Sequence, residues 1–159
     1  MTTSKTKAKT KAKTKAKAKT QKPDPSRPAS KWGPRIAEQG WTALPNMLLY
    51  NQAKLKLTDG EFITLTHLMS HWWTKGKRPF VRKKTISFRT GKDSRSIQRH
   101  ISSLSEPRQV VGLPSPVALL TRHERYEDRK QKASEFSFEG LLEVLEVFAA
   151  EESARRKEK

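Results

Sequence analysis

The sequence predicts a mainly helical fold of the α+β class that follows a disordered tail. Three observations support this prediction: apolar residues recur at helical spacing in several segments, two short strand-like runs occur late in the chain, and a lysine-rich start has nothing to bury. The chain has 159 residues and no cysteine. We therefore expect one folded domain without disulfides.

The first 30 residues predict a disordered basic tail and a proline-rich linker. Lysine alternates with Thr or Ala from Lys5 to Lys19, and these like charges repel one another without gathering on one helical face. Prolines in residues 21–30 favour an extended linker. We expect the tail to bind DNA phosphates without sequence preference. The alternatives are a tail that serves solubility alone and a mitochondrial transit peptide, although the repeat lacks the arginines and the amphipathic pattern of transit peptides.

The folded domain is predicted to span residues 31–150 and to be followed by a polar end at 151–159. Its first clear element is a short helix. Pro45 suits the opening turn of this helix, the apolar residues after it have helical spacing, and we expect the helix to end near Lys54.

A longer second helix is predicted to supply most of the core. Thr58 and Glu61 have the spacing of a capping box, and apolar residues follow at helical intervals up to Gly76. A domain this small needs large buried side chains. We therefore expect Trp72 and Trp73 to pack in the core rather than to stack on bases.

Two shorter helices joined by a tight turn are predicted between Thr85 and Leu104. The first is expected over residues 85–90, and Gly91 supplies the left-handed residue that ends it. Asp93 suits the N-cap of the second helix, which we expect from Asp93 to Leu104. Its aliphatic residues, Ile97, Ile101 and Leu104, share one face. This arrangement is a helix-turn-helix.

The outward face of the second helix is rich in side chains that donate hydrogen bonds to bases and phosphates. Arg pairs with guanine, Gln pairs with adenine, and Ser bonds either base or phosphate. The predicted base-reading residues are Arg95, Ser96, Gln98, Arg99 and Ser102. The predicted phosphate-binding residues are Lys83, Lys84, Thr85, Arg89, Lys92, Arg122 and Arg125.

A two-stranded wing is predicted after the second of these helices. Prolines and a glycine between residues 107 and 116 are expected to prevent regular structure. Strands are expected at 117–122 and 136–138, with a loop of mixed charge between them. The predicted fold is therefore a winged helix-turn-helix.

A last helix is predicted from Glu139 onward. Its apolar residues Leu141, Leu142, Leu145 and Phe148 share one face. This face is expected to pack either on the core or on a second copy of the chain, which would make the protein a homodimer.

Positive charge is concentrated in two segments. The net charge is +18; residues 1–31 hold 11 basic and 1 acidic residue, residues 75–104 hold 10 and 1, and the other segments are nearly balanced. A merely soluble domain would spread such charge evenly. The pattern favours a polyanionic partner, which we expect to be double-stranded DNA.

Other functional classes find little support in the sequence. It has no phosphate-cradling glycine loop, paired-carboxylate motif or nucleophile elbow, so we expect neither an enzyme nor a cofactor nor a small-molecule ligand. His67 and His71 lie four residues apart but lack a third ligand at a recognisable spacing, so we expect no metal site. With no apolar run of membrane length and no secretory signal, the expected location is the cytoplasm, in association with the nucleoid.

Several motifs together resemble bacterial helix-turn-helix proteins of the MarR-like winged-helix type. They are Lys31-Trp32-Gly33, Gly40-Trp41-Thr42 with Leu44-Pro45, Trp72-Trp73 before Lys77-Arg78-Pro79-Phe80, Ser96-Ile97-Gln98-Arg99-His100-Ile101, and Phe136-Ser137-Phe138-Glu139-Gly140-Leu141. The resemblance implies DNA binding, by a regulator or by a protein of plasmid or phage replication. The chain departs from the family in the polar residues Thr90 and Lys92 of its turn and in its long connector.

Our leading hypothesis is sequence-specific binding of double-stranded DNA for transcriptional regulation. Three alternatives stay open. One is a plasmid or phage replication or maintenance protein, and another is a non-specific architectural binder similar to linker histones. The third is an adaptor whose helix-turn-helix no longer binds DNA.

Overall fold

A computed structural model describes residues 28–127 and 130–158 of the chain. It divides the chain into two units, Met1–Gly40 and Trp41–Lys159. The predictions made for the lysine repeat lie outside the described residues. The domain boundaries expected from the sequence stay a prediction.

The described part of the first unit consists of two short helices, α1 (Pro28–Trp32) and α2 (Pro34–Glu38). Gly33 joins them with a φ of 85°, and Pro34 occupies the first turn of α2. Neither helix contains a buried residue. The predicted extended linker is therefore wrong for residues 28–30, where Pro28 begins a helix because its fixed φ suits a first helical turn.

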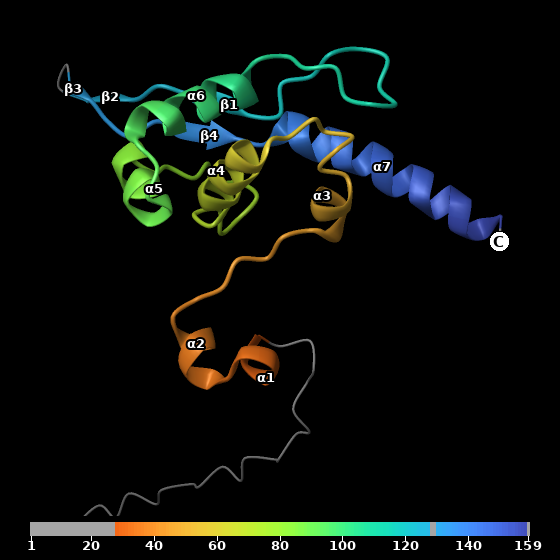
Figure 1. Ribbon diagram of the computed structural model, residues 1–159, viewed down its shortest axis with the longest axis horizontal. Helices are drawn as coiled ribbons and strands as arrows, with labels where there is room; N and C mark the ends of the chain where they lie inside the picture. The colour runs from red at the N-terminus through yellow and green to blue at the C-terminus, as the bar shows by residue number, and fades with distance from the viewer. Residues whose placement is uncertain (1–27, 128–129, 159) are drawn as a thin grey trace, which may run out of the picture. The chain divides into compact units, whose positions relative to one another are not determined.

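The second unit holds five helices among its described residues, together with two small antiparallel sheets. In Figure 1, α5 and α6 lie toward one end of this unit, close to the strands, and the C-terminal half of α7 extends toward the other end. The helices are α3 (Asn46–Tyr50), α4 (Asp59–Met69), α5 (Lys83–Thr90), α6 (Ser94–Ser105) and α7 (Glu139–Lys157).

Helix α3 is shorter than expected. It ends at Tyr50 instead of near Lys54, and Pro45 is its N-cap rather than part of its first turn. The Asn51 side chain donates to the Met47 carbonyl over 2.8 Å and occupies an acceptor at the helix end. The turns that follow carry the chain directly to α4.

Helix α4 begins as predicted and ends early. The Thr58 hydroxyl accepts from the Glu61 N–H and the Glu61 carboxylate accepts from the Thr58 N–H, which confirms the capping box. After Met69 the chain tightens, because the Trp72 N–H donates to the Met69 carbonyl three residues back. Trp72 packs against Phe138, but Trp73 is 77% exposed. The predictions of a helix up to Gly76 and of core packing by Trp73 are therefore wrong.

A small antiparallel sheet forms around strand β4 (Glu135–Ser137) at the place of the predicted wing, and we keep the name wing for this part of the chain. Strand β1 (Thr121–His123) pairs antiparallel with one side of β4, with Arg122 opposite Phe136. Phe80 forms a single β-bridge to Glu135, so the segment that leads into α5 also pairs with β4. Beyond this sheet, β2 (Tyr126–Glu127) and β3 (Lys130–Gln131) form a second antiparallel pair.

Both predicted strand positions need correction. The first strand begins at Thr121 rather than at Val117, because Leu119 and Leu120 are buried in the core and the Leu120 N–H donates to the Leu104 carbonyl at the end of α6. Val117 bridges Arg108 instead, so the connector is not wholly irregular. The second strand ends at Ser137, one residue earlier than expected.

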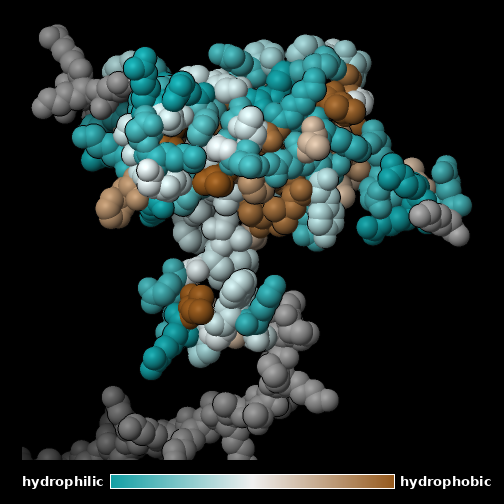
Figure 2. Space-filling view, in the orientation of Figure 1, coloured by the Kyte–Doolittle hydropathy of each residue, from teal (hydrophilic) through white to brown (hydrophobic). Residues whose placement is uncertain are grey.

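One core joins the helices of the second unit to the root of the wing. The predicted stripe on α6 is confirmed, since Ile97, Ile101 and Leu104 are buried. Leu142 of α7 is only half-buried, whereas the other residues of its predicted stripe are buried. The face seen in Figure 2 is largely hydrophilic and carries only small hydrophobic patches. Other core residues are Leu48, Leu55, Leu65, Leu68, Ile86, Val110, Phe136, Phe138 and Val144.

A buried ion pair connects the start of α4 with the end of α6. Arg108 donates to the Glu61 carboxylate over 2.8 Å, and both side chains are largely inaccessible to solvent. Arg108 also donates to the Ser103 carbonyl, while the Ser103 hydroxyl donates to Glu61 over 2.6 Å. Burial raises the pKa of Glu61, but hydrogen bonds from Arg108, Ser103 and Thr58 outweigh burial and lower it from 4.5 to about 2.

We predict that Glu61→Gln destabilises the fold at neutral pH, because it leaves the Arg108 guanidinium buried without its counter-charge. The expected loss of unfolding free energy is about 3 to 5 kcal/mol. A folded-state pKa of about 2 lies below the ordinary 4.5, so the charged pair stabilises above pH 4.5 and loses its effect as the pH falls toward 2. Urea unfolding at several pH values should show the difference between the two proteins shrinking over this range.

Glu143→Gln provides the matched control, because Glu143 is exposed on α7. It should leave the unfolding free energy nearly unchanged. Equal stability of Glu61→Gln and the unmodified protein at pH 7 would contradict the role assigned to the pair.

Candidate nucleic-acid interface

The turn between α5 and α6 has the predicted geometry. Gly91 is left-handed with a φ of 69°, and Asp93 caps α6 by accepting from the Ser96 N–H over 2.8 Å. The Thr90 hydroxyl donates to the Ile86 carbonyl and accepts from the Lys92 N–H. Polar bonds thus hold the turn at Thr90 and Lys92, the two positions where the chain departs from the family that it resembles.

Helix α6 is also fixed against α4 by a close contact. The His100 Nδ1 lies 3.0 Å from the Thr64 hydroxyl. Gly60 permits this approach, because a Cβ atom on that residue would lie 2.6 Å from the His100 ring. Packing on one face and these polar contacts fix the direction in which the opposite face of α6 points.

Two arginines of α6 extend into solvent. Arg95 is exposed, and its side chain has no hydrogen bond or ion pair with any other residue that the structure describes. Arg99 is exposed and donates to the Ser96 hydroxyl over 2.9 Å. Both lie in the N-terminal half of α6, the half that contacts base edges when such a helix enters a major groove.

The other three predicted base-reading residues already have partners. The Ser96 hydroxyl donates to the Asp93 carboxylate over 2.7 Å, so Ser96 contributes to the helix cap. Gln98 accepts from Lys83 and donates to the hydroxyl of Ser102. The roles of these three residues in reading bases stay a prediction. To contact a base, each would have to exchange its present hydrogen bond for one to DNA.

The predicted phosphate-binding residues of α5 and the turn also include side chains without a partner and side chains that already have one. Lys84 and Lys92 are exposed, and their side chains have no partner among the described residues, whereas Lys83 is bonded to Gln98 over 2.6 Å. Thr85 is half-buried. Arg89 lies 3.0 Å from the His71 Nε2.

Burial, followed by the positive charge of Arg89, lowers the pKa of both His67 and His71. The imidazole of His71 is therefore neutral at neutral pH. Because arginine can only donate, the Nε2 atom of His71 accepts the hydrogen bond from Arg89. Across residues 28–127 and 130–158, no group of three or more potential metal-binding side chains occurs.

The two wing arginines that were predicted to bind phosphate, Arg122 and Arg125, are paired within the chain. Arg122 donates to the Ser134 hydroxyl over 2.9 Å and lies 3.4 Å from Glu124. Arg125 pairs with Glu135 over 3.2 Å and lies over the ring of Phe80. The mixed charge of this loop thus forms internal ion pairs, and phosphate binding by these two arginines stays a prediction.

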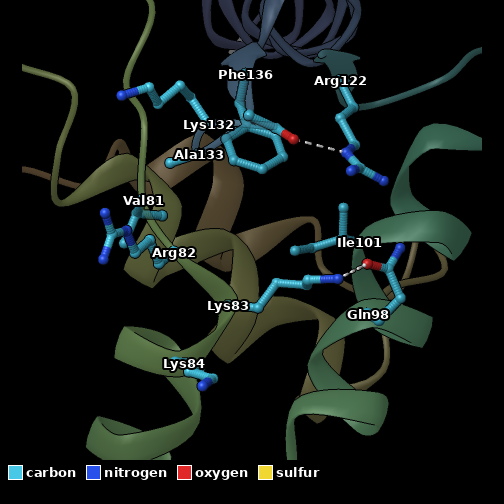
Figure 3. A pocket seen from close by; sticks show the side chains of 11 residues that line it. Val81, Arg82, Lys83, Lys84, Gln98, Ile101, Arg122, Lys132, Ala133 and Phe136 are labelled. Carbon is cyan, nitrogen blue, oxygen red and sulfur yellow. Dashed lines mark hydrogen bonds between the residues drawn. The ribbon is translucent and has the colours of Figure 1, made fainter. Parts of the chain in front are cut away.

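A cationic pocket of about 240 Å³ lies where α5, α6 and the wing meet. Figure 3 shows Gln98 and Ile101 of α6 on one side and Arg122 and Phe136 of the wing on another. No carboxylate from the described part of the chain lines it. Its basic residues are Arg82, Lys83, Lys84, Arg122 and Lys132.

The electrostatics of this pocket favour an anion. Arg82, Lys83 and Lys84 stand at the N-terminus of α5, where the helix dipole is already positive and the first turn holds no acidic residue. A phosphate oxygen accepts from exposed backbone N–H groups and cations at such a position. Among the pocket cations, Arg82 and Lys132 were not included in the predicted site. The adjacent Arg82-Lys83-Lys84 run was a usable signal for Arg82, whereas Lys132 joins the site only because the wing folds back.

Comparison with known protein families gives a match for the central part of this region. Residues 55–106, which include α4, α5 and α6, match a family described as a helix-turn-helix domain. No curated protein matches the chain. No helix among the described residues is long and apolar enough to cross a membrane. The match indicates DNA binding and ends before the wing.

We predict that Arg82→Ala and Lys84→Ala weaken binding to every DNA duplex alike. Each lost phosphate contact should lower the slope of log Kd against log salt by about 0.9, because fewer counterions are released. Titration of labelled duplexes at several salt concentrations measures this slope.

Arg156→Ala near the end of α7 removes the same charge and serves as the control. It should leave the slope nearly unchanged. Slopes of the two pocket variants that equal the slope of this control would contradict phosphate binding in the pocket.

Proposed function

We propose that this protein binds double-stranded DNA at a preferred sequence through α6 and thereby regulates transcription. The observation that carries the proposal is the exposed N-terminal half of α6. Arg95 and Arg99 project there from a helix held by its buried face, and neither is paired with a carboxylate of residues 28–127 or 130–158. Arginine bonds guanine through two donors in the major groove.

The cationic pocket gives α6 a fixed depth and register on the duplex. A backbone phosphate bound among Arg82, Lys84 and the wing would position the helix without reading sequence. Specificity then depends on very few side chains, because Gln98 and Ser96 are occupied by internal bonds in the free protein.

The remaining parts of the proposal concern affinity and assembly. The lysine repeat adds binding energy that is strongly salt-dependent and indifferent to sequence. A homodimer acting on a two-fold symmetric site is part of the proposal, as is the absence of enzymatic chemistry. We also propose that the domain is of the MarR-like winged type, and the bridge of Phe80 to β4, which joins the helix-turn-helix to the wing, supports this assignment.

Selection of bound duplexes from a random pool tests the proposal, using the full chain with non-specific competitor DNA. We predict one enriched motif. Arg95→Ala and Arg99→Ala should each weaken binding to that motif about tenfold to a hundredfold while changing affinity for unrelated duplexes much less, because one base contact contributes about 1–3 kcal/mol.

Arg155→Ala in the last turn of α7 is the matched control for loss of charge. Enrichment of directly repeated sites would point instead to replication or maintenance. An architectural binder would enrich no motif. For an adaptor whose helix-turn-helix no longer binds DNA, Arg95→Ala and Arg99→Ala would leave every binding assay unchanged.

A further inference from the structure

Six consecutive residues between α4 and α5 form an exposed loop with two fixed ends. At one end, Trp72 packs against Phe138 with ring centroids 5.2 Å apart. At the other end, Pro79 is buried and its carbonyl accepts from the Phe136 N–H over 3.0 Å. All residues from 73 to 78 are exposed, and we call this segment the Trp73 loop.

The Trp73 loop carries one indole and three positive charges. Trp73 is 77% exposed, whereas its neighbour Trp72 packs against Phe138, so Trp73 contributes little to the core. Lys75, Lys77 and Arg78 follow within five residues, and none pairs with a described carboxylate. The Lys77 N–H donates to the Thr74 carbonyl over 3.1 Å, which closes a turn within the loop.

A cavity of about 490 Å³ lies beside the loop. Lys75, Lys77 and Arg78 line one part of it, and Trp72 and Phe138 line another. Two carboxylates also reach it. Glu135 is paired with Arg125, and Glu139 belongs to the first turn of α7. The lining of the cavity therefore keeps a net positive charge from the three cations of the loop.

We propose that the Trp73 loop is a binding site for single-stranded DNA. Trp73 stacks on an unpaired base, and Lys75, Lys77 and Arg78 bind the phosphates on either side of it. An exposed indole among cations is the combination by which proteins hold single strands, since every base offers a π-face for stacking and every nucleotide a phosphate. The choice of DNA rather than RNA rests on the proposed function.

A duplex offers this loop fewer contacts than a single strand does. In a duplex each base is stacked on both faces, so an indole gains no base contact and only the phosphates remain available. Loop binding of a single strand therefore adds an activity to the duplex binding proposed for α6. Together, the Trp73 loop and α6 would hold DNA at a junction between a double-stranded and a single-stranded region.

The test compares the full chain with Trp73→Leu and Trp73→Phe by anisotropy of a labelled 20-nucleotide oligothymidylate and of a 20-base-pair duplex. Trp73→Leu should weaken oligothymidylate binding about tenfold, and Trp73→Phe should retain most of it, because only the aromatic residue stacks. The effect of Trp73→Leu should persist as salt rises. Lys75→Ala should weaken binding mainly at low salt, as expected for a phosphate contact.

Tyr50→Leu is the matched control, because Tyr50 is 75% exposed on α3, away from the loop in sequence. It should bind both DNAs as the unmodified protein does. The proposal is overturned if Trp73→Leu binds oligothymidylate normally, if it loses duplex affinity by the same factor, or if an oligouridylate binds far more tightly than oligothymidylate. Thermal unfolding of each variant excludes misfolding as the cause.

The same assay separates this proposal from the function proposed for α6. Arg95→Ala should weaken binding to the selected duplex and leave oligothymidylate binding unchanged. Loss of oligothymidylate binding in Trp73→Leu without any preferred duplex would overturn only the proposed regulator. A preferred duplex together with an unaffected Trp73→Leu would overturn only the single-strand site.

Discussion

The buried pair of Glu61 and Arg108 is the constraint on which the placement of α6 depends. Glu61 caps the start of α4, and Arg108 reaches back from the connector to the carbonyl of Ser103 near the end of α6. One carboxylate thus fixes two helices and the chain that leads to the wing. Together with the contact between His100 and Thr64, it holds α6 rigidly enough for its outward side chains to keep a defined geometry.

Internal bonds divide the polar surface into occupied and available side chains. Gln98, Lys83, Arg122 and Arg125 are held by neighbours, and they stiffen the junction of α5, α6 and the wing. The available cations among the described residues include Arg95 of α6, Lys84 of α5 and Lys92 of the turn. High net charge therefore does not mean that every basic residue contacts a ligand.

Local signals in the sequence predicted the elements that depend on local physics. The capping box of α4, the left-handed Gly91, the Asp93 cap and the apolar stripe of α6 all follow from short-range spacing, and all are present. Features set by tertiary contacts were missed. The bridge of Phe80 is one residue long and leaves no alternating pattern, and no spacing distinguishes the packed Trp72 from the exposed Trp73. The cationic pocket likewise needs the wing to fold back onto α5.

Strand β4 has neighbours on both edges, with β1 on one side and the Pro79-Phe80 segment on the other. Strand β1 and the segment that ends the Trp73 loop are therefore both attached to Glu135–Ser137. A partner that immobilises one edge reduces the conformational entropy still to be lost at the other. A partner bound at the wing and a strand bound at the Trp73 loop would then be thermodynamically linked in both directions.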